Sequence, residues 1–294
     1  MKTAIGYGKR QIGVYRTGAG PLEGVRPIPE SSFAGRSNRL FACEVDVEVF
    51  GEAVLPAYTE GDNSQVVPTD TMKNTVYAMA REHLTGSIED FGRVLAQHFL
   101  EFPQVERATV SIQENRWRPV VGGSQPAPDA FIRAGEYTRT ANVIAASDGT
   151  IFEAGIQDLT LMKTTKSAFE RFPRDAYTTL PEVSDRIMAT RVKAVWTFNG
   201  PDIDWDASFD RTIDIFLSVF AEHFSPSVQN SIWVMGRAIL ELQPDISEVR
   251  MTLPNLHHWL VDLSPFGQDN PGEIFVATTE PHGLIEATVR RSTG

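Results

Sequence analysis

The sequence is poor in the residues that build disulfides and metal centres. Its 294 residues include a single cysteine, Cys43, which excludes an internal disulfide and any zinc or iron–sulfur site made of cysteine ligands. We expect this cysteine inside a strand. His257 and His258 are adjacent, and adjacent side chains on a strand point to opposite faces, so the pair would not bind one ion. The sequence therefore predicts no metal site.

Long apolar runs and an excess of positive charge are also missing. No stretch approaches the roughly 20 apolar residues of a membrane-spanning helix, and residues 1–6 lack the apolar run of a signal peptide. The net charge of −11 argues against nucleic acid or an anionic membrane as a partner. An anionic small molecule is still allowed, because the potential at one site can oppose the overall sign.

The motifs of common nucleotide-binding enzymes and hydrolases are absent as well. There is no P-loop, no His-Glu-x-x-His and no nucleophile elbow, and Gly6-Tyr7-Gly8 lacks the strand and helix that flank a dinucleotide fingerprint. We interpret Arg116-Trp117-Arg118 as a solvated strand end. What the chain does have is an ordinary hydrophobic content of 41%, enough to bury a core in about two domains or in one large one.

The first half of the chain shows strand and helix patterns in a regular order. Strands are predicted around residues 12–16 and 40–50, separated by a Gly/Pro-rich stretch at about 18–38 that we interpret as an exposed excursion. Two helices and another strand follow. Their apolar residues share single faces: Met72, Val76 and Met79; Ile88, Phe91, Leu95, Phe99 and Phe102; Ala108, Val110 and Ile112.

The second half repeats this order. Gly92-Arg93 and Gly236-Arg237 occupy similar places in the two halves, at a period of about 140 residues. Ser225-Pro226 is predicted to open the second helix, as a cap followed by proline at the first helical position. The apolar faces are Ile213, Phe216, Leu217, Phe220 and Phe224; Val228, Ile232, Met235, Ile239 and Leu242; Val249, Met251 and Leu253.

Each half thus has the order strand–strand–helix–helix–strand–strand. This predicts an α+β fold in which an antiparallel sheet carries helices on one face. We place the two domains at residues 1–145 and 146–294. Such sheets have open edges, which are hazardous unless they are paired, and pairing between domains and subunits would close a barrel. We therefore expect an obligate oligomer.

The residues that could carry chemistry are dispersed, and each also has an ordinary structural interpretation. Thr69 would be a helix N-cap, Gln229 a first-turn helix residue, and Asn255 a turn residue. Arg186 would be a surface charge, and Lys9, near the start of the chain, a solvated lysine. Composition and spacing alone predict no active site.

Six segments, spread from residue 7 to about residue 290, nevertheless carry distinctive motifs: Tyr7-Gly8-Lys9, Thr69–Thr75, Phe172–Leu180, Leu253–His258, Gln268–Pro271 and Gly283–Thr288. In this order they resemble the signature segments of urate oxidases. The chain departs from that family in its Gly/Pro-rich insertion after Arg16 and in ending without the peroxisomal tripeptide of eukaryotic members.

The resemblance implies an oxidation of urate by O₂ and water to 5-hydroxyisourate and H₂O₂, without a cofactor. It implies the tunnelling fold, with two such domains in tandem in each chain. Four chains would assemble as a homotetramer around a barrel-like tunnel, with active sites where subunits meet. Without the peroxisomal signal, we expect a cytoplasmic protein of the bacterial type.

The resemblance also implies residue roles. Lys9, Thr69 and His257 would form the catalytic relay, and Asn255 would lie beside the O₂ or water position. Asp70 would contribute through its backbone. Lys9 and Thr69 would come from a different chain than the side that holds the purine. The residues that hold it would be Phe169, Arg186, Val228 and Gln229.

These residue types suit a planar urate anion. Arg186 offers a planar fork of donors for a bidentate grip, and the amide of Gln229 both donates and accepts. Thr69-Asp70 and Val228-Gln229 lie at predicted helix N-termini, where free N–H groups and the positive dipole end favour an anion. Lys9 could act as a base only if sequestration from water lowered its pKa.

Two alternatives keep the fold and change the function. Related tunnelling folds act on pterins, but a pterin cyclohydrolase typically needs zinc, for which this chain has no plausible ligand set. The other alternative is a catalytically silent oligomer that binds purines or acts as a scaffold. Such a degenerate member should have lost Lys9, Thr69 or His257, and this chain has all three.

Overall fold

The computed structural model describes residues 5–18, 39–123 and 125–291. Nearly all of the predicted excursion at 18–38 lies outside the described residues. The chain divides into two compact units, residues 1–154 with 200–205 and residues 155–199 with 206–294. Among the residues that the structure describes, no helix is both long and apolar enough to cross a bilayer.

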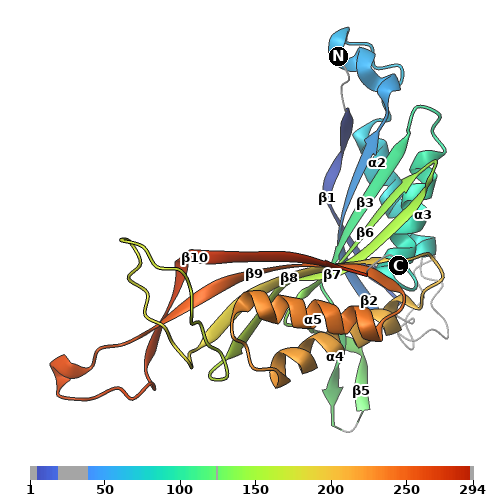
Figure 1. Cartoon of the computed structure of the whole chain (residues 1–294). Helices are drawn as coiled ribbons and strands as arrows, with labels where there is room; N and C mark the ends of the chain where they lie inside the picture. The colour runs from blue at the N-terminus through green and yellow to red at the C-terminus, as the bar shows by residue number, and fades with distance from the viewer. Residues whose placement is uncertain (1–4, 19–38, 124, 292–294) are drawn as a thin grey trace. The chain divides into compact units, whose positions relative to one another are not determined.

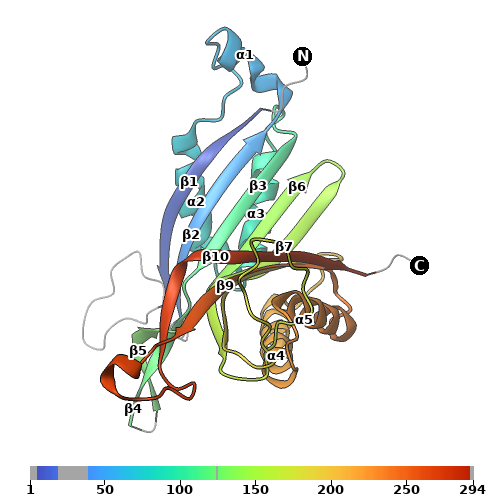
Figure 2. The same ribbon diagram turned by 60° about the vertical axis from the view of Figure 1, so that its left-hand side comes forward.

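The first unit is built on an antiparallel sheet with strand order β1-β2-β3-β6. Helices α2 and α3 pack against one face of this sheet (Figure 1), as the second view also shows (Figure 2). The bounds are β1 Gly6–Thr17, β2 Leu40–Phe50, η1 Glu52–Val54, α1 Leu55–Thr59, α2 Thr69–His83, α3 Ile88–Leu100, β3 Arg107–Glu114 and β6 Thr138–Ala146.

The second unit repeats the plan with strand order β8-β9-β10 and helices α4 and α5. Helix α5 packs on β9 and β10 (Figure 1). The strand β7 begins in the first unit and continues into the second. The bounds are β7 Gly149–Lys163, β8 Met188–Phe198, α4 Trp205–Glu222, α5 Val228–Leu242, β9 Ile246–Leu260, η2 Ser264–Phe266 and β10 Phe275–Arg290. The predicted α+β architecture is confirmed.

The cores follow the sequence periodicity. In β2, Val45, Val47 and Val49 are at most 1% exposed, and the acidic residues between them are partly exposed, as a strand with one covered face requires. Cys43 lies in the same strand and is 4% exposed, which confirms its predicted place. Burial raises the pKa of its thiol.

A glycine lets one helix of each unit approach its sheet closely. A Cβ on Gly92 in α3 would lie 2.9 Å from a Val143 methyl, and a Cβ on Gly236 in α5 would lie 2.7 Å from a Val289 methyl. Either position would clash if it carried a side chain. The same residue type therefore serves the same contact in both halves, which supports the internal repeat.

Two helix starts differ from the predictions. The N-cap of α2 is Pro68 rather than Thr69, and Thr69 is the first helical residue. The N-cap of α5 is Ser227, whose hydroxyl accepts a hydrogen bond from the Asn230 N–H at 3.1 Å. The predicted opening at Ser225-Pro226 is wrong, because the backbone of Ser225 is bonded to another segment instead of the helix.

Some predicted apolar faces are one residue too long or misplaced. Ala80 rather than Met79 completes the buried face of α2. Phe102 and Phe224 lie beyond the ends of their helices, and Phe224 is 54% exposed. Leu242 ends α5 and is 61% exposed. Apolar residues at helical spacing can continue past the end of a helix, because their spacing does not indicate where the backbone hydrogen bonds of the helix stop.

A hairpin that the sequence did not predict separates β3 from β6. Its strands are β4 (Trp117–Gly122) and β5 (Gln125–Arg133), which form a two-stranded sheet of their own. The predicted order of six elements in the first half therefore omits the β4–β5 hairpin.

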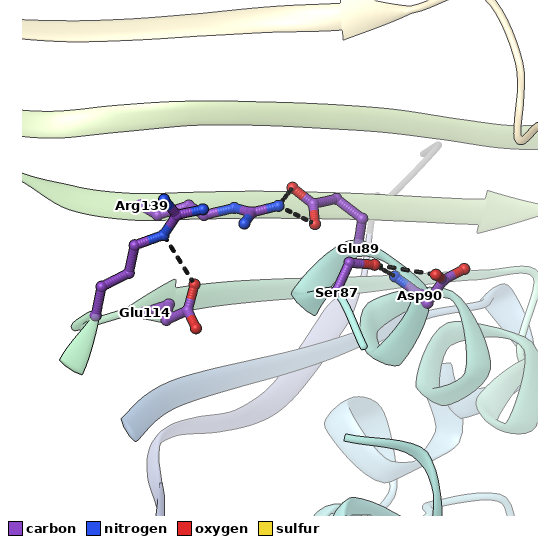
Figure 3. A network of polar contacts seen from close by, with 6 residues as sticks. Ser87, Glu89, Asp90, Glu114 and Arg139 are labelled. Atoms are coloured by element: carbon purple, nitrogen blue, oxygen red, sulfur yellow. Dashed lines mark hydrogen bonds and ion pairs between the residues drawn. The ribbon is translucent and has the colours of Figure 1, made fainter. Parts of the chain in front are cut away.

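The first unit also contains a fully buried ion pair. Arg139 on β6 donates to both carboxylate oxygens of Glu89 on α3, at 3.0 and 2.8 Å, and both side chains are 1% exposed. Figure 3 shows this contact beside Glu114, the register partner of Arg139 on β3. The pair ties α3 to the sheet of the first unit.

Candidate active site

The second unit contains a cavity of about 690 Å³ between the α5 N-terminus and the strand β9. Apolar side chains form much of its wall, and a few polar groups converge on it, which is the usual character of a small-molecule site. The cavity brings together six of the nine residues singled out in the sequence: Phe169, Arg186, Val228, Gln229, Asn255 and His257.

The segment that carries Phe169 is held in place by backbone hydrogen bonds on both sides. On one side, Phe169 and Val183 exchange N–H···O bonds of 2.8 and 3.1 Å, and the Arg186 N–H donates to the Ser167 carbonyl at 2.8 Å. On the other side, Ser225, which lies just before α5, exchanges backbone hydrogen bonds with Lys166 and Ala168. Three stretches distant in sequence thus form one wall of the cavity.

Arg186 is a partly buried arginine that forms no ion pair with any residue the structure describes. Its Nε is buried and has no hydrogen-bond partner among the described residues. Its guanidinium carbon lies 5.2 Å from the centroid of the Phe169 ring, and Phe169 stacks on Phe172 with centroids 4.9 Å apart. Burial lowers the pKa of Arg186. Its interpretation as a surface charge is therefore wrong.

The N-terminus of α5 contributes backbone donors. Ser227 caps the helix, so Val228 and Gln229 are its first two residues, which confirms Gln229 in the first turn. The first N–H groups of a helix have no partner within the helix and stand at the positive end of its dipole. Because Arg186 lines the same cavity, two features that favour an anion act on one space.

Asn255 and His257 lie on β9 and share one of its faces, since strand residues two apart point the same way. Asn255 pairs with Thr190 on β8 and with Gly283 on β10, so it is a central strand residue and its interpretation as a turn residue is wrong. The pairing with β10 lapses between His257 and Asn255, where residues 279–282 bulge out. His257 stacks on Trp259 with ring centroids 5.6 Å apart.

The other three residues, Lys9, Thr69 and Asp70, lie together in the first unit. Lys9 is partly buried on β1 and pairs with Val47, and Thr69 opens α2, which packs on β1. A hydrogen bond from Lys73 lowers the pKa of Asp70, and the positive charge of Lys9 adds to the effect. Lys9, which pattern alone interprets as a solvated lysine near the start of the chain, is thus a partly buried strand residue.

A close backbone contact holds Lys9 at this position. A Cβ on Gly8 would lie 1.9 Å from the carbonyl oxygen of Val47, so only glycine fits there. The Tyr7 phenolic oxygen accepts a hydrogen bond of 2.7 Å from the Val67 N–H, just before Thr69. The signature Tyr7-Gly8-Lys9 thus has a local reason: its first two residues fix the strand against its neighbours.

The structure thus groups the nine residues into two sets, one in each unit of the chain. Sequence reasoning missed the residues that build the walls, among them Trp259, Ser225 and Leu256. Leu256 lies within the Leu253–His258 segment and Trp259 directly follows it, which could have indicated both. Ser225 gave no such signal, because its role depends on a contact with residues 166–168.

Taken together, these features define a class of protein. A chain with two repeats of an antiparallel sheet with helices on one face has the tunnelling fold, and a cavity that joins a partly buried arginine to a helix N-terminus suits an anionic small molecule. Comparison with known proteins identifies the member of that class. The family model described as Uricase matches residues 6–144 and 152–286, and the chain belongs to the uricase family.

Individual relatives agree with this assignment. A uricase of Arthrobacter globiformis is 45% identical over 236 residues, covering 80% of this chain and 76% of the relative. A uricase of Dictyostelium discoideum is 34% identical over 288 residues, covering 97% and 96%. The crystal structure of the Arthrobacter globiformis uricase superposes with a TM-score of 0.89 at 38% identity, covering 100% of this chain and 96% of that one.

The chain is accordingly an oxidoreductase that oxidises urate. This decides against the pterin cyclohydrolase, which shares the fold and not the family. The residues that carry the reaction, and the assembly in which they do so, are a separate question.

Proposed function

We propose that the two sets of residues form one catalytic site for urate, with the Lys9 and Thr69 side supplied by one chain and the Arg186 and Gln229 side by another. The chains would assemble as a homotetramer around a tunnel, with a site at each such contact. The observation that carries the proposal is Arg186. The guanidinium is partly buried, its buried Nε has no partner among the described residues, and it lines the same cavity as a helix N-terminus, an arrangement that favours an anion.

Urate would bind through several complementary contacts. The fork of Arg186 donates two parallel hydrogen bonds to adjacent acceptors of the purine edge, and the Val228 N–H adds a backbone donor. The Gln229 amide reads a neighbouring edge with one donor and one acceptor. Phe169 contacts the ring of the purine. On the side of the first unit, the backbone N–H of Asp70, free at the start of α2, is a further donor.

The chemistry needs proton transfer and placement. Lys9, Thr69 and His257 would form a relay that removes a proton from the urate monoanion, and the resulting dianion gives electrons to O₂ held near Asn255. A hydroperoxide on the ring follows. Water then supplies the ring hydroxyl, so urate, O₂ and H₂O give 5-hydroxyisourate and H₂O₂. Urate loses two electrons and O₂ gains them, which balances the reaction.

We propose that no cofactor takes part, because urate is itself the reducing agent and its dianion is electron-rich. O₂ is the only acceptor that the balance requires. A cytoplasmic location of the bacterial type stays a prediction from the sequence.

The reaction is tested by mixing the purified chain with urate in air. We expect the ultraviolet absorbance of urate to disappear and one peroxide to form per urate consumed, with no effect of EDTA or of added flavin. A chain that binds urate and never consumes it would instead be the silent scaffold.

The relay is tested by Lys9→Met. Urate binding should be largely kept, because the proposed hydrogen bonds to the purine come from Arg186, Val228 and Gln229, while turnover falls by about three orders of magnitude. Unchanged turnover would remove Lys9 from the mechanism.

Sharing of the site between chains is tested by complementation. Lys9→Met and Arg186→Gln chains, each inactive alone, are co-expressed and the mixed oligomers isolated. Sites that combine the intact first unit of one chain with the intact second unit of another should recover activity. Mixed oligomers as inactive as the two parents would show that each site is built from one chain.

A further inference from the structure

Two buried serine hydroxyls near the start of α5 converge on one backbone carbonyl. Ser225 Oγ and Ser231 Oγ lie 2.8 Å apart, and they lie 3.1 and 3.2 Å from the carbonyl oxygen of Ser227. Both residues are 0% exposed. The same carbonyl also accepts the Ser231 N–H at 3.1 Å, the first hydrogen bond of the helix.

The helix does not need the two hydroxyls as a cap. The cap is Ser227, whose own hydroxyl accepts from the Asn230 N–H. Nor do the hydroxyls simply satisfy each other, since each is within reach of the same carbonyl oxygen. Their shared target, the Ser227 carbonyl, indicates what they hold in place.

That carbonyl belongs to the same peptide group as the N–H of Val228. A trans peptide is planar, and its C=O and N–H point in opposite directions. Hydrogen bonds that hold the Ser227 carbonyl toward the interior therefore hold the Val228 N–H toward the other side. Val228 lines the cavity that contains Arg186.

We propose that Ser225 and Ser231 are positioning residues that aim the Val228 N–H at the bound urate. This rests on the function proposed above. The two hydroxyls supply two protons: one serine donates to the Ser227 carbonyl, and the other donates to the first serine. Either serine can take either part, because both lie within hydrogen-bonding distance of the carbonyl.

Ser225 has a second connection to the same cavity. Its N–H donates to the Lys166 carbonyl at 2.9 Å, and its carbonyl accepts from the Ala168 N–H at 2.8 Å. These bonds fix the segment that ends in Phe169 relative to the N-terminus of α5. Ser225 therefore fixes the positions of both the Phe169 segment and the Val228 N–H.

The proposal predicts a specific pattern among three variants, S225A, S231A and the double variant. Each single variant keeps one hydroxyl for the carbonyl, so we expect the urate KM and the Kd of xanthine to rise only about two- to threefold. The double variant loses both, and its KM and Kd should rise about tenfold or more, beyond the product of the single effects. The effect should fall on KM rather than on kcat.

The matched control is S247A, which removes a serine hydroxyl that donates to the Thr197 carbonyl at 3.1 Å in the same unit, outside the cavity lining. It should lower thermal stability about as much as the single variants and leave KM unchanged. If the double variant does not fold, the two single variants provide the test. A rise in the Kd of xanthine in both S225A and S231A, without a rise in S247A, supports the proposal. An unchanged Kd in the two single variants contradicts it.

Wild-type affinity in the folded double variant, or a loss confined to kcat, would overturn the positioning role. A wild-type chain that fails to oxidise urate would instead overturn the proposed function. The two failures are therefore distinguishable in one set of assays.

Discussion

The phenolic oxygen of Tyr7 on β1 accepts a hydrogen bond of 2.7 Å from the backbone N–H of Val67. This contact joins the strand that carries Lys9 to the residues that lead into Thr69. Tyr7 and Lys9 lie two residues apart on one strand, so they share a face. The spacing between the proposed base and its threonine partner therefore depends on a side chain that takes no part in the chemistry.

We expect Tyr7→Phe to lower turnover about two- to tenfold, since the loss of one hydrogen bond loosens the approach of Lys9 to Thr69. The affinity for xanthine should change little. Steady-state kinetics and equilibrium binding measure the two effects. Tyr15→Phe is the control, because Tyr15 lies on the same strand and is 72% exposed. Equal effects of the two substitutions would contradict the prediction.

Arg186→Lys tests the shape of the arginine rather than its charge. A lysine keeps the positive charge and loses the planar fork, so we expect the urate KM to rise about a hundredfold. Arg191→Lys, on the exposed face of β8, should leave KM unchanged. An Arg186→Lys chain with the KM of the wild type would show that only charge matters at this position.

The buried pair of Glu89 and Arg139 (Figure 3) allows a prediction on stability. Glu89→Gln leaves a buried arginine without the charge of its partner, which should reduce the free energy of unfolding by about 3–5 kcal/mol. Chemical denaturation measures the loss. The control is Glu82→Gln on α2, a side chain that is 76% exposed. A loss as small as that of the control would mean that the pair contributes little.

The lowered pKa of His223 allows a prediction of how stability depends on pH. Burial and then the charge of Lys163 lower the pKa of His223 below its ordinary value of 6.5. The unfolded chain therefore binds the proton first, and stability is fully present above pH 6.5 and falls as the pH drops from there toward the folded pKa. In His223→Gln, the melting temperature should fall less over this range. An identical pH profile in the variant would contradict the assignment.

The two candidate starts of α5 show what a local sequence pattern does not predict. Ser225-Pro226 and Ser227-Val228 both fit the pattern of a capped helix, and the sequence favours the first because proline suits the first helical position. The structure selects the second, because the backbone of Ser225 is bonded to residues 166 and 168. A choice made by residues about sixty positions away is invisible to any local window.

Arg186 and Asn255 in the cavity of the second unit show the same limit of prediction from local sequence. Pattern alone interpreted Arg186 as a surface charge and Asn255 as a turn residue, and both interpretations fail for one reason. Asn255 is held by its pairing with β8 and β10, and Arg186 by its backbone bond to Ser167, and these segments meet only in the folded unit. The resemblance to urate oxidases pointed to these residues without supplying that reason.

By itself, the sequence determined the α+β class, the repeated order of strands and helices, most buried faces and, through its six signature segments, the family. These follow from periodicity and from short motifs, which are properties of neighbouring residues. Only the tertiary structure decided that the Nε of Arg186 is buried, that Tyr7 ties the strand of Lys9 to the residues before Thr69, and that Ser225 and Ser231 converge on one carbonyl. Burial and hydrogen-bond partners depend on segments distant along the chain, and folding alone brings those segments together.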